Sequence, residues 1–188
     1  MKQKAFFLDR DGVLIFDKHF VGDPKNVELI PGVRDFLQWA IAENYHLFLF
    51  TNQSGVGRGY FTIEDVHACN NRMLELLDMH HSIFKEVCIA PEGPHEPSLY
   101  RKPSPRFILE MIEKFSLDPK HCYMFGDTVT DLQAGIQAGV NAVWVQTGHG
   151  LTDELKTYIE KHQLPVIPKL TSFQEMLKKQ QDGLPLSI

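Results

Sequence analysis

The sequence predicts an α/β protein with a Rossmann-like three-layer α/β/α fold around a parallel sheet. Short apolar runs of strand length alternate with longer segments of helical period, which is the pattern of successive β-α-β units. The composition, with 43% apolar and 23% charged residues, is that of an ordinary globular protein. A chain of 188 residues can bury one core without disulfides, so we expect a single domain over residues 1–188.

Strands are expected where an apolar run ends in a polar or glycine-rich turn. These runs lie at about 4–9, 46–50, 85–90, 121–126 and 141–146. Between them, apolar residues recur with helical period at about 32–44, 62–78, 104–116 and 129–138. Pro31 and Pro105 near two helix starts and Gly139 after the fourth helix support these boundaries.

The C-terminal part is expected to complete the sheet and cover it. A helix-like stretch at 152–162 is followed by a short strand from Leu164 to Ile167 and a last helix near 171–180. The connections at 13–31 and 91–104 are short, so we expect only a minimal cap over the strand ends.

Charge and hydropathy narrow the classes of partner. The formal net charge of -5 attracts no polyanion, and the 19 lysines and arginines form no basic run, so nucleic acid is not an expected partner. The longest apolar stretches are far shorter than the roughly 20 residues that span a bilayer. Asp9 ends the N-terminal apolar run too early for an export signal, and three widely spaced cysteines do not suggest disulfides. We expect a cytoplasmic monomer with no membrane partner.

Two polar clusters follow the first two predicted strands. Asp9 and Asp11 are two residues apart on extended chain, so both carboxylates can face one reacting centre. The alternative for this pair is a solvated strand end with a turn glycine. The run 51–55, Thr-Asn-Gln-Ser-Gly, offers neutral hydrogen-bond donors that suit a phosphate oxygen, although the same residues also form plain turns.

Two further clusters follow the third and fourth strands. Arg101 and Lys102 can clamp a phosphate, although such a pair alone is usually solvated surface. Asp127 ends a strand and Asp131 lies one helical turn later, so both can face the same crevice, although an acid in a first helical turn is also favoured by the helix dipole. Carboxylate oxygens suit Mg²⁺ better than zinc. Because the carboxyl ends of parallel strands line one crevice, all four clusters are expected to meet there.

In this order and at these strand ends, the four clusters resemble the haloacid dehalogenase (HAD) superfamily of phosphatases over about residues 1–150. Within it the chain looks like the small-cap branch that holds histidinol-phosphate phosphatases and heptose bisphosphate phosphatases. The run 51–59 followed by Phe61-Thr62 is most similar to the D-glycero-D-manno-heptose 1,7-bisphosphate kind. The resemblance therefore implies a HAD-like fold and a small phosphorylated metabolite as the substrate.

The resemblance also implies roles for single residues. Asp9 would attack phosphorus and become an aspartyl phosphate, while Asp11 would act as general acid and then as general base. Thr51 and Lys102 would bind the phosphoryl group. The side chains of Asp9 and Asp127, with the backbone carbonyl of Asp11, would hold Mg²⁺, and Asp131 would support them. The candidate substrate contacts are Asn52, Gln53, Ser54, Arg101 and Thr128.

The sequence departs from the family in the loop before Arg101. Many relatives carry a cysteine-rich zinc loop there, but only Cys88 keeps the pattern and His95 lies at the wrong spacing, so we predict no structural zinc. Thr128 is a second departure, because heptose phosphatases often place a lysine after this aspartate. The missing cation is compatible with a substrate that carries one phosphate.

Three other functions compete with a heptose bisphosphate phosphatase. A histidinol-phosphate phosphatase would need acidic contacts near the entrance, for which Asp17, Asp23 and Glu92 are candidates. A phospho-accepting receiver domain also combines acids, a hydroxyl and a lysine, but it accepts phosphate after its third strand. A catalytically idle sugar-phosphate-binding protein would not need every catalytic group. His80 and His81 are expected on the surface at a helix end.

Overall fold

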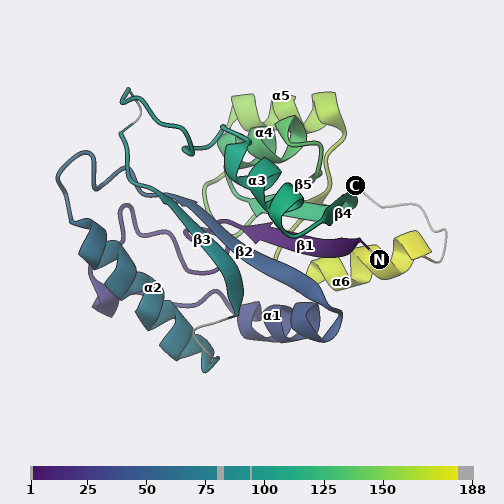
Figure 1. Cartoon of the computed structure of the whole chain (residues 1–188), viewed down its shortest axis with the longest axis horizontal. Coiled ribbons are helices and arrows are strands. Elements are labelled where there is room, and N and C mark those ends of the chain that lie inside the picture. Colours follow the sequence, from purple (N-terminus) through teal and green to yellow (C-terminus); the bar gives the residue numbers. More distant parts are fainter. Residues whose placement is uncertain (1, 80–82, 94, 182–188) are drawn as a thin grey trace.

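One parallel sheet of six strands organises the part of the chain that the structure describes, and all of its pairings are parallel (Figure 1). The computed structural model describes residues 2–79, 83–93 and 95–181, so His80 and His81 lie outside the described residues. The strand order is β3-β2-β1-β4-β5-β6. The strands are β1 (Gln3–Leu8), β2 (Tyr45–Asn52), β3 (Phe84–Ala90), β4 (Leu117–Gly126), β5 (Asn141–Val145) and β6 (Val166–Ile167).

Helices cover both faces of the sheet, which confirms the predicted three-layer fold. The helices are α1 (Val33–Ala42), α2 (Ile63–Leu77), α3 (Arg106–Lys114), α4 (Val129–Gln137), α5 (Asp153–His162) and α6 (Ser172–Gln181), with a 3-10 turn η1 (Pro24–Asn26). Residues of α1, α2 and α6 share one core cluster with the sheet, while α3, α4 and α5 contribute to the clusters on the other face (Figure 1).

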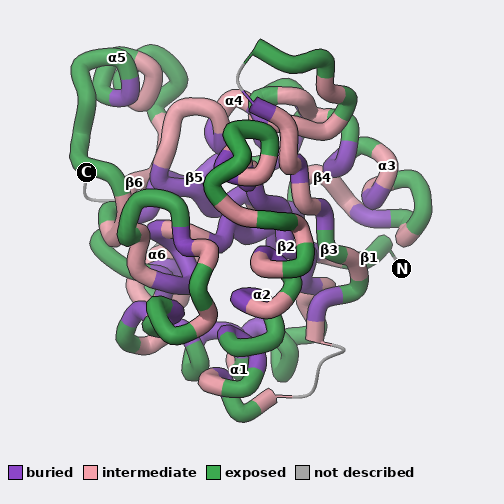
Figure 2. Tube along the Cα trace, turned by 90° about the vertical axis from the view of Figure 1, so that its left-hand side faces the viewer, coloured by how far each residue is buried: buried purple, intermediate pink, exposed green. Residues whose placement is uncertain are grey.

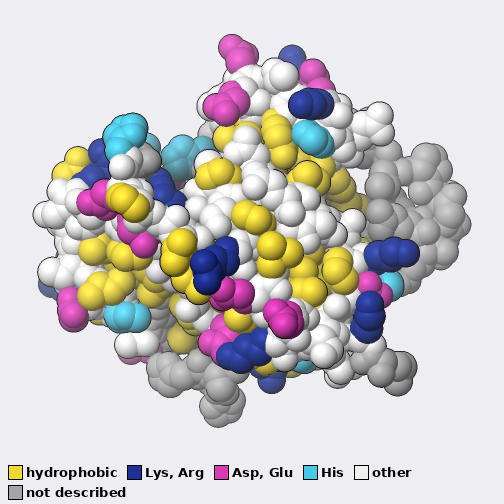
Figure 3. All heavy atoms as spheres, turned by 45° about the horizontal axis from the view of Figure 1, so that its top comes forward, with side chains coloured by type: hydrophobic (Ala, Val, Ile, Leu, Met, Phe, Trp, Pro, Cys, Tyr) yellow, Lys and Arg dark blue, Asp and Glu magenta, His cyan; other side chains and the backbone are white. Residues whose placement is uncertain are grey.

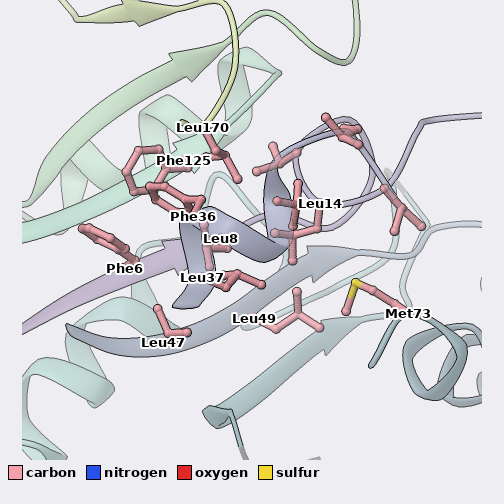
Figure 4. Packing of buried hydrophobic residues seen from close by; sticks show 14 of the residues in the cluster. Phe6, Leu8, Leu14, Phe36, Leu37, Leu47, Leu49, Met73, Phe125 and Leu170 are labelled. Carbon is pink, nitrogen blue, oxygen red and sulfur yellow. The ribbon is translucent and has the colours of Figure 1, made fainter. Parts of the chain in front are cut away.

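The alternation of side chains along β1 explains how one strand serves both layers. Phe6 and Leu8 belong to the cluster under α1, whereas Ala5 and Phe7 belong to the cluster under α3. Phe6 stacks on Phe36 of α1 with ring centroids 5.4 Å apart, and both lie in the close packing that Figure 4 shows. Figure 2 shows buried strands at the centre and exposed residues on the outer segments.

The predicted elements are confirmed, and most of the differences concern their ends. The last strand was predicted from Leu164, but β6 holds only Val166 and Ile167. The amide N–H of Leu164 instead donates to the carbonyl of Ile159 at the end of α5, and Pro165 has no N–H to donate. Likewise β4 begins at Leu117, before the predicted start at 121, because Leu117 pairs with Gln3 across a register shift.

The topology separates this chain from a receiver domain. A receiver has the strand order 2-1-3-4-5, whereas here β1 lies between β2 and β4. The connection from β1 to α1 forms a short flap held by isolated bridges that pair Ile15 with Asp11 and with Leu29. No helix of the described residues is long and apolar enough to cross a membrane. On the face seen in Figure 3, acidic and basic side chains are interspersed.

Candidate active site

A cavity of about 260 Å³ opens at the carboxyl ends of β1, β2 and β4. All four predicted clusters contribute to its lining, as the crevice rule for parallel sheets requires. Its walls contain Asp9, Asp11, Asp17, His19, Phe20, Asn52, Gln53, Ser54, Arg101, Lys102, Asp127, Thr128, Thr130, Asp131 and His149. Thr51 is fully buried and is absent from this lining, and its hydroxyl oxygen accepts a hydrogen bond from Gln53 Nε2 at 2.9 Å.

Three buried carboxylates form the floor of the cavity. Oxygen atoms of Asp9, Asp127 and Asp131 all lie within 4.8 Å of one another, and the three residues are at most 8% exposed. The sheet register brings the first two together, because the amide of Asp9 donates to the carbonyl of Phe125 on β4 at 3.1 Å. The carboxylate of Asp11 lies outside this group, which leaves its backbone carbonyl as the atom for the predicted metal contact.

Lys102 lies between two of these carboxylates. Its Nζ is 3.0 Å from Asp9 Oδ1 and 2.5 Å from Asp131 Oδ1, and it donates to the carbonyl of Phe50 at 2.9 Å. Asn52 fixes the backbone of Lys102 from both sides, since its side chain accepts from the Lys102 amide at 2.9 Å and donates to the Lys102 carbonyl at 3.1 Å. Asn52 was predicted to contact substrate, and the structure shows that its amide group also positions the lysine.

The electrostatics of this group call for a cation. Burial raises the pKa of the Asp9 carboxyl well above its ordinary value, and the ammonium of Lys102 opposes that rise. Burial also raises the pKa of Asp127, and the neighbouring Asp131 adds to the effect. Burial alone would lower the pKa of Lys102, but Asp131 and Asp9 outweigh it and raise the pKa. With every group ionised, three carboxylates and one ammonium leave two negative charges, which one divalent cation would neutralise.

The backbone approaches the Asp127 carboxylate closely at two glycines. A Cβ placed on Gly12 would lie 2.4 Å from Asp127 Oδ2, and one on Gly148 would lie 2.0 Å from the same atom. Gly12 also has φ of 77°, a left-handed conformation that glycine adopts freely. Oxygen ligands without soft donors suit Mg²⁺, so the residues present fit that metal.

Asp11 is held by two neighbours. Gln53 Nε2 donates to Asp11 Oδ2 at 2.7 Å, and Arg10 donates to the same oxygen through Nη2 at 3.0 Å. Arg10 is fully buried and also donates to Asn70 Oδ1 at 3.0 Å. Sequence reasoning missed Arg10, although a cation between two acids was a visible signal. Gln53 was predicted to contact substrate, and its observed bonds orient Asp11.

His149 is a second residue that sequence reasoning missed. Its backbone N–H donates to Asp127 Oδ2 at 2.7 Å, and its Nδ1 lies 3.0 Å from the same oxygen. This hydrogen bond raises the pKa of His149, while partial burial opposes the rise. The residues 147–150, Thr-Gly-His-Gly, follow β5, so the rule that found the other clusters would have found this one. Thr147 Oγ1 donates to the Gly12 carbonyl at 2.7 Å and ties the loop to the first cluster.

The remaining predicted contacts lie on the rim of the cavity. Arg101 Nη1 donates to the carbonyl of Glu92 at 2.8 Å, and burial lowers the pKa of its guanidinium. Thr128 lines the cavity, but its hydroxyl donates to Asp131 Oδ2 at 2.6 Å and caps α4. Ser54 also lines the cavity.

The loop after β3 contains no cluster of metal ligands among the residues that the structure describes. Neither Cys88 nor His95 belongs to a group of three candidate ligands there. Cys88 is buried, which raises the pKa of its thiol to about 12. The absence of a structural zinc stays a prediction.

The chain matches known proteins over most of its length. A family model described as HAD-hydrolase-like matches residues 99–173. The D-glycero-beta-D-manno-heptose-1,7-bisphosphate 7-phosphatase of Rhodopseudomonas palustris is 33% identical over 146 residues, covering 74% of this chain and 81% of that protein. The corresponding alpha enzyme of Campylobacter jejuni is 34% identical over 143 residues, covering 76% of this chain and 82% of its own length.

One solved structure is similar over almost the whole fold. The D,D-heptose 1,7-bisphosphate phosphatase of B. bronchiseptica, in complex with magnesium and phosphate, superimposes with a TM-score of 0.81 at 27% identity. The match covers 95% of this chain and 99% of that protein.

Proposed function

Because the chain belongs to the HAD-like hydrolases and is a phosphatase of the heptose-1,7-bisphosphate 7-phosphatase family, we propose that it removes the 7-phosphate of a D-glycero-D-manno-heptose 1,7-bisphosphate with the help of Mg²⁺. The observation that carries the proposal is the group of Asp9, Lys102, Asp127 and Asp131 in one cavity. It combines a carboxylate nucleophile, a fixed ammonium and an oxygen ligand set for a divalent cation.

The reaction proceeds in two displacements at phosphorus. A carboxylate oxygen of Asp9 forms a bond to phosphorus as the bond from phosphorus to the sugar oxygen breaks, and Asp11 donates a proton to that oxygen. Asp11 then takes a proton from water, whose oxygen attacks phosphorus and releases Asp9 and inorganic phosphate. The contacts from Gln53 and Arg10 hold the Asp11 carboxylate at the cavity, where it can serve both steps.

Charge stabilisation comes from cations around the transferred group. A phosphoryl transition state spreads negative charge over its outer oxygens, so fixed positive charge accelerates the reaction. Lys102 supplies one such charge from a position fixed by Asn52. The side chains of Asp9 and Asp127, with the backbone carbonyl of Asp11, would hold Mg²⁺, and Asp131 would support them. The ion supplies further charge neutralisation when bound.

The second phosphate of the substrate would bind at the rim. Arg101 lines the cavity and is adjacent in sequence to Lys102. Its Nη1 donates to the carbonyl of Glu92 at 2.8 Å, which orients the guanidinium. A planar guanidinium can hold a phosphate through two parallel hydrogen bonds. Ser54 adds a hydroxyl to the same lining. These groups favour a bisphosphate over a substrate with one phosphate.

Phosphate release from a substrate panel tests this proposal. The panel contains both anomers of the heptose 1,7-bisphosphate, the heptose 7-phosphate, histidinol phosphate and fructose 1,6-bisphosphate, each with Mg²⁺ and with a chelator. We expect the highest kcat/KM on one heptose bisphosphate anomer and no turnover with the chelator. A higher kcat/KM on histidinol phosphate or turnover independent of divalent cations would overturn the proposal.

A further inference from the structure

A second group of metal-ligand side chains lies at the mouth of the cavity. Ligand atoms of Asp17, His19 and His149 all lie within 4.8 Å of one another. Asp17 and His19 come from the flap after β1, whereas His149 comes from the loop after β5. Asp17 is partly buried and both histidines are exposed, so the group faces solvent as well as the cavity. We propose that these three residues bind a zinc-type divalent cation, distinct from the Mg²⁺ held by the floor carboxylates.

The spacing of the ligand atoms suits zinc. His149 Nε2 lies 3.3 Å from Asp17 Oδ2. Two ligands about 2.1 Å from a tetrahedral zinc ion lie about 3.4 Å from each other, so this pair already has the separation that the ion requires. The rings of His19 and His149 have centroids 6.4 Å apart, and a ligand atom of His19 already lies within 4.8 Å of those of the other two residues.

Neighbouring hydrogen bonds orient two of the ligands. His149 Nδ1 lies 3.0 Å from Asp127 Oδ2, so a neutral ring with its proton on Nδ1 would bond to that carboxylate and present the Nε2 lone pair to Asp17. A carboxylate behind a metal-binding histidine is the usual arrangement in zinc sites. Asp17 Oδ1 accepts the amide N–H of His19 at 2.8 Å, which leaves Oδ2 for the metal.

The ligand types select the metal. Two imidazoles and one carboxylate bind zinc and similar transition metals, whereas Mg²⁺ prefers oxygen ligands alone. Three protein ligands leave at least one position open, as in zinc sites that bind small molecules. The two metals would therefore occupy separate places joined by the His149 ring and the Asp127 carboxylate.

Calorimetric titration tests the site: a zinc salt is titrated into the untagged protein in a buffer that contains a large excess of Mg²⁺. We expect one zinc per chain, and binding weakened by at least about tenfold in each of His19→Ala, His149→Gln and Asp17→Asn. His121→Ala is the matched control, because His121 Nδ1 lies 3.0 Å from Asp118 Oδ2 in a pair without a second imidazole. Its zinc affinity should equal that of the wild type.

Two further measurements keep the result independent of folding and of phosphatase activity. Circular dichroism establishes that each variant is folded, and Asp9→Asn should keep the zinc affinity of the wild type because Asp9 lies outside this group. Absence of zinc binding in the wild type, an undiminished affinity in folded His19→Ala, or an equal loss in His121→Ala would overturn the proposal.

Discussion

The ammonium of Lys102 lies 3.0 Å from Oδ1 of Asp9, although Asp9 follows β1 and Lys102 follows β3, two β-α-β units later in the chain. The same ammonium is 2.5 Å from Asp131, and both Lys102 and Asp131 are at most 2% exposed. A buried charge whose partner is removed is costly, because water does not reach it. We therefore expect Lys102 to stabilise the fold as well as the charge on the transferred phosphoryl group.

Lys102→Met should abolish phosphate release and lower the free energy of unfolding by about 3–5 kcal/mol in the absence of divalent cations. Urea denaturation followed by circular dichroism measures the second effect. Lys114→Met is the control, since Lys114 pairs with Glu86 on the exposed surface and its loss should cost at most about 1 kcal/mol. Equal stability of the two variants would contradict the assigned role of Lys102.

Gly12→Ala should lower kcat by about 100-fold, because its methyl group would collide with the Asp127 carboxylate and displace it. The variant should also lose the thermal stabilisation that Mg²⁺ gives the wild type. Gly139→Ala is a matched control: the two glycines have φ of 77° and 76°, but a Cβ on Gly139 meets nothing within 4 Å.

Both alanine variants should share the backbone cost of about 1–2 kcal/mol for the left-handed conformation. Steady-state kinetics and thermal melts with and without Mg²⁺ separate that shared cost from the effect on the site. A Gly12→Ala enzyme as active as Gly139→Ala would contradict the inference that the close approach of Gly12 to Asp127 is needed for activity.

The three thiols should be protected in the native protein. Burial raises the pKa of Cys88 and of Cys122 to about 12 and also raises the pKa of Cys69. At pH 8 a thiol with a pKa near 12 is ionised in roughly one molecule in ten thousand, and the thiolate is the reactive form. A disulfide reagent at pH 8 should react with the native protein only through unfolding, and with all three thiols in guanidinium.

The raised pKa values of the thiols also determine how stability changes with pH. The native protein holds these thiol protons more tightly than the unfolded chain, so these groups contribute a stability that falls as pH rises from about 9 toward 12. Fast modification of one native thiol at pH 8 would contradict the burial of that residue.

Local pattern was enough to predict the sheet and most of the floor of the site. The main strands contain apolar runs, and the polar residues that end these runs, such as Asp9 and Asp127, have to meet at one edge of a parallel sheet. Their meeting depends on topology alone, so no side-chain detail was needed. His149 obeys the same rule, because its loop directly follows β5.

The bonding partners of the individual polar residues could not be predicted in this way. Asn52 and Gln53 were expected at substrate, yet their amides bond to Lys102 and to Asp11. Those partners lie 50 and 42 residues away along the chain, so the bonds depend on packing between loops. Similarly, a buried Arg10 that bonds to Asn70 on α2 requires the helix to be docked on the sheet.

The covalent role of Asp9 is tested most directly by trapping its phosphorylated form. The wild-type enzyme, quenched during turnover of the heptose bisphosphate and reduced with borohydride, is digested and read by mass spectrometry. We predict that reduction converts the acyl phosphate into homoserine at position 9, only with substrate and Mg²⁺ present. Homoserine at another aspartate, or full turnover without any reduced residue, would contradict the account.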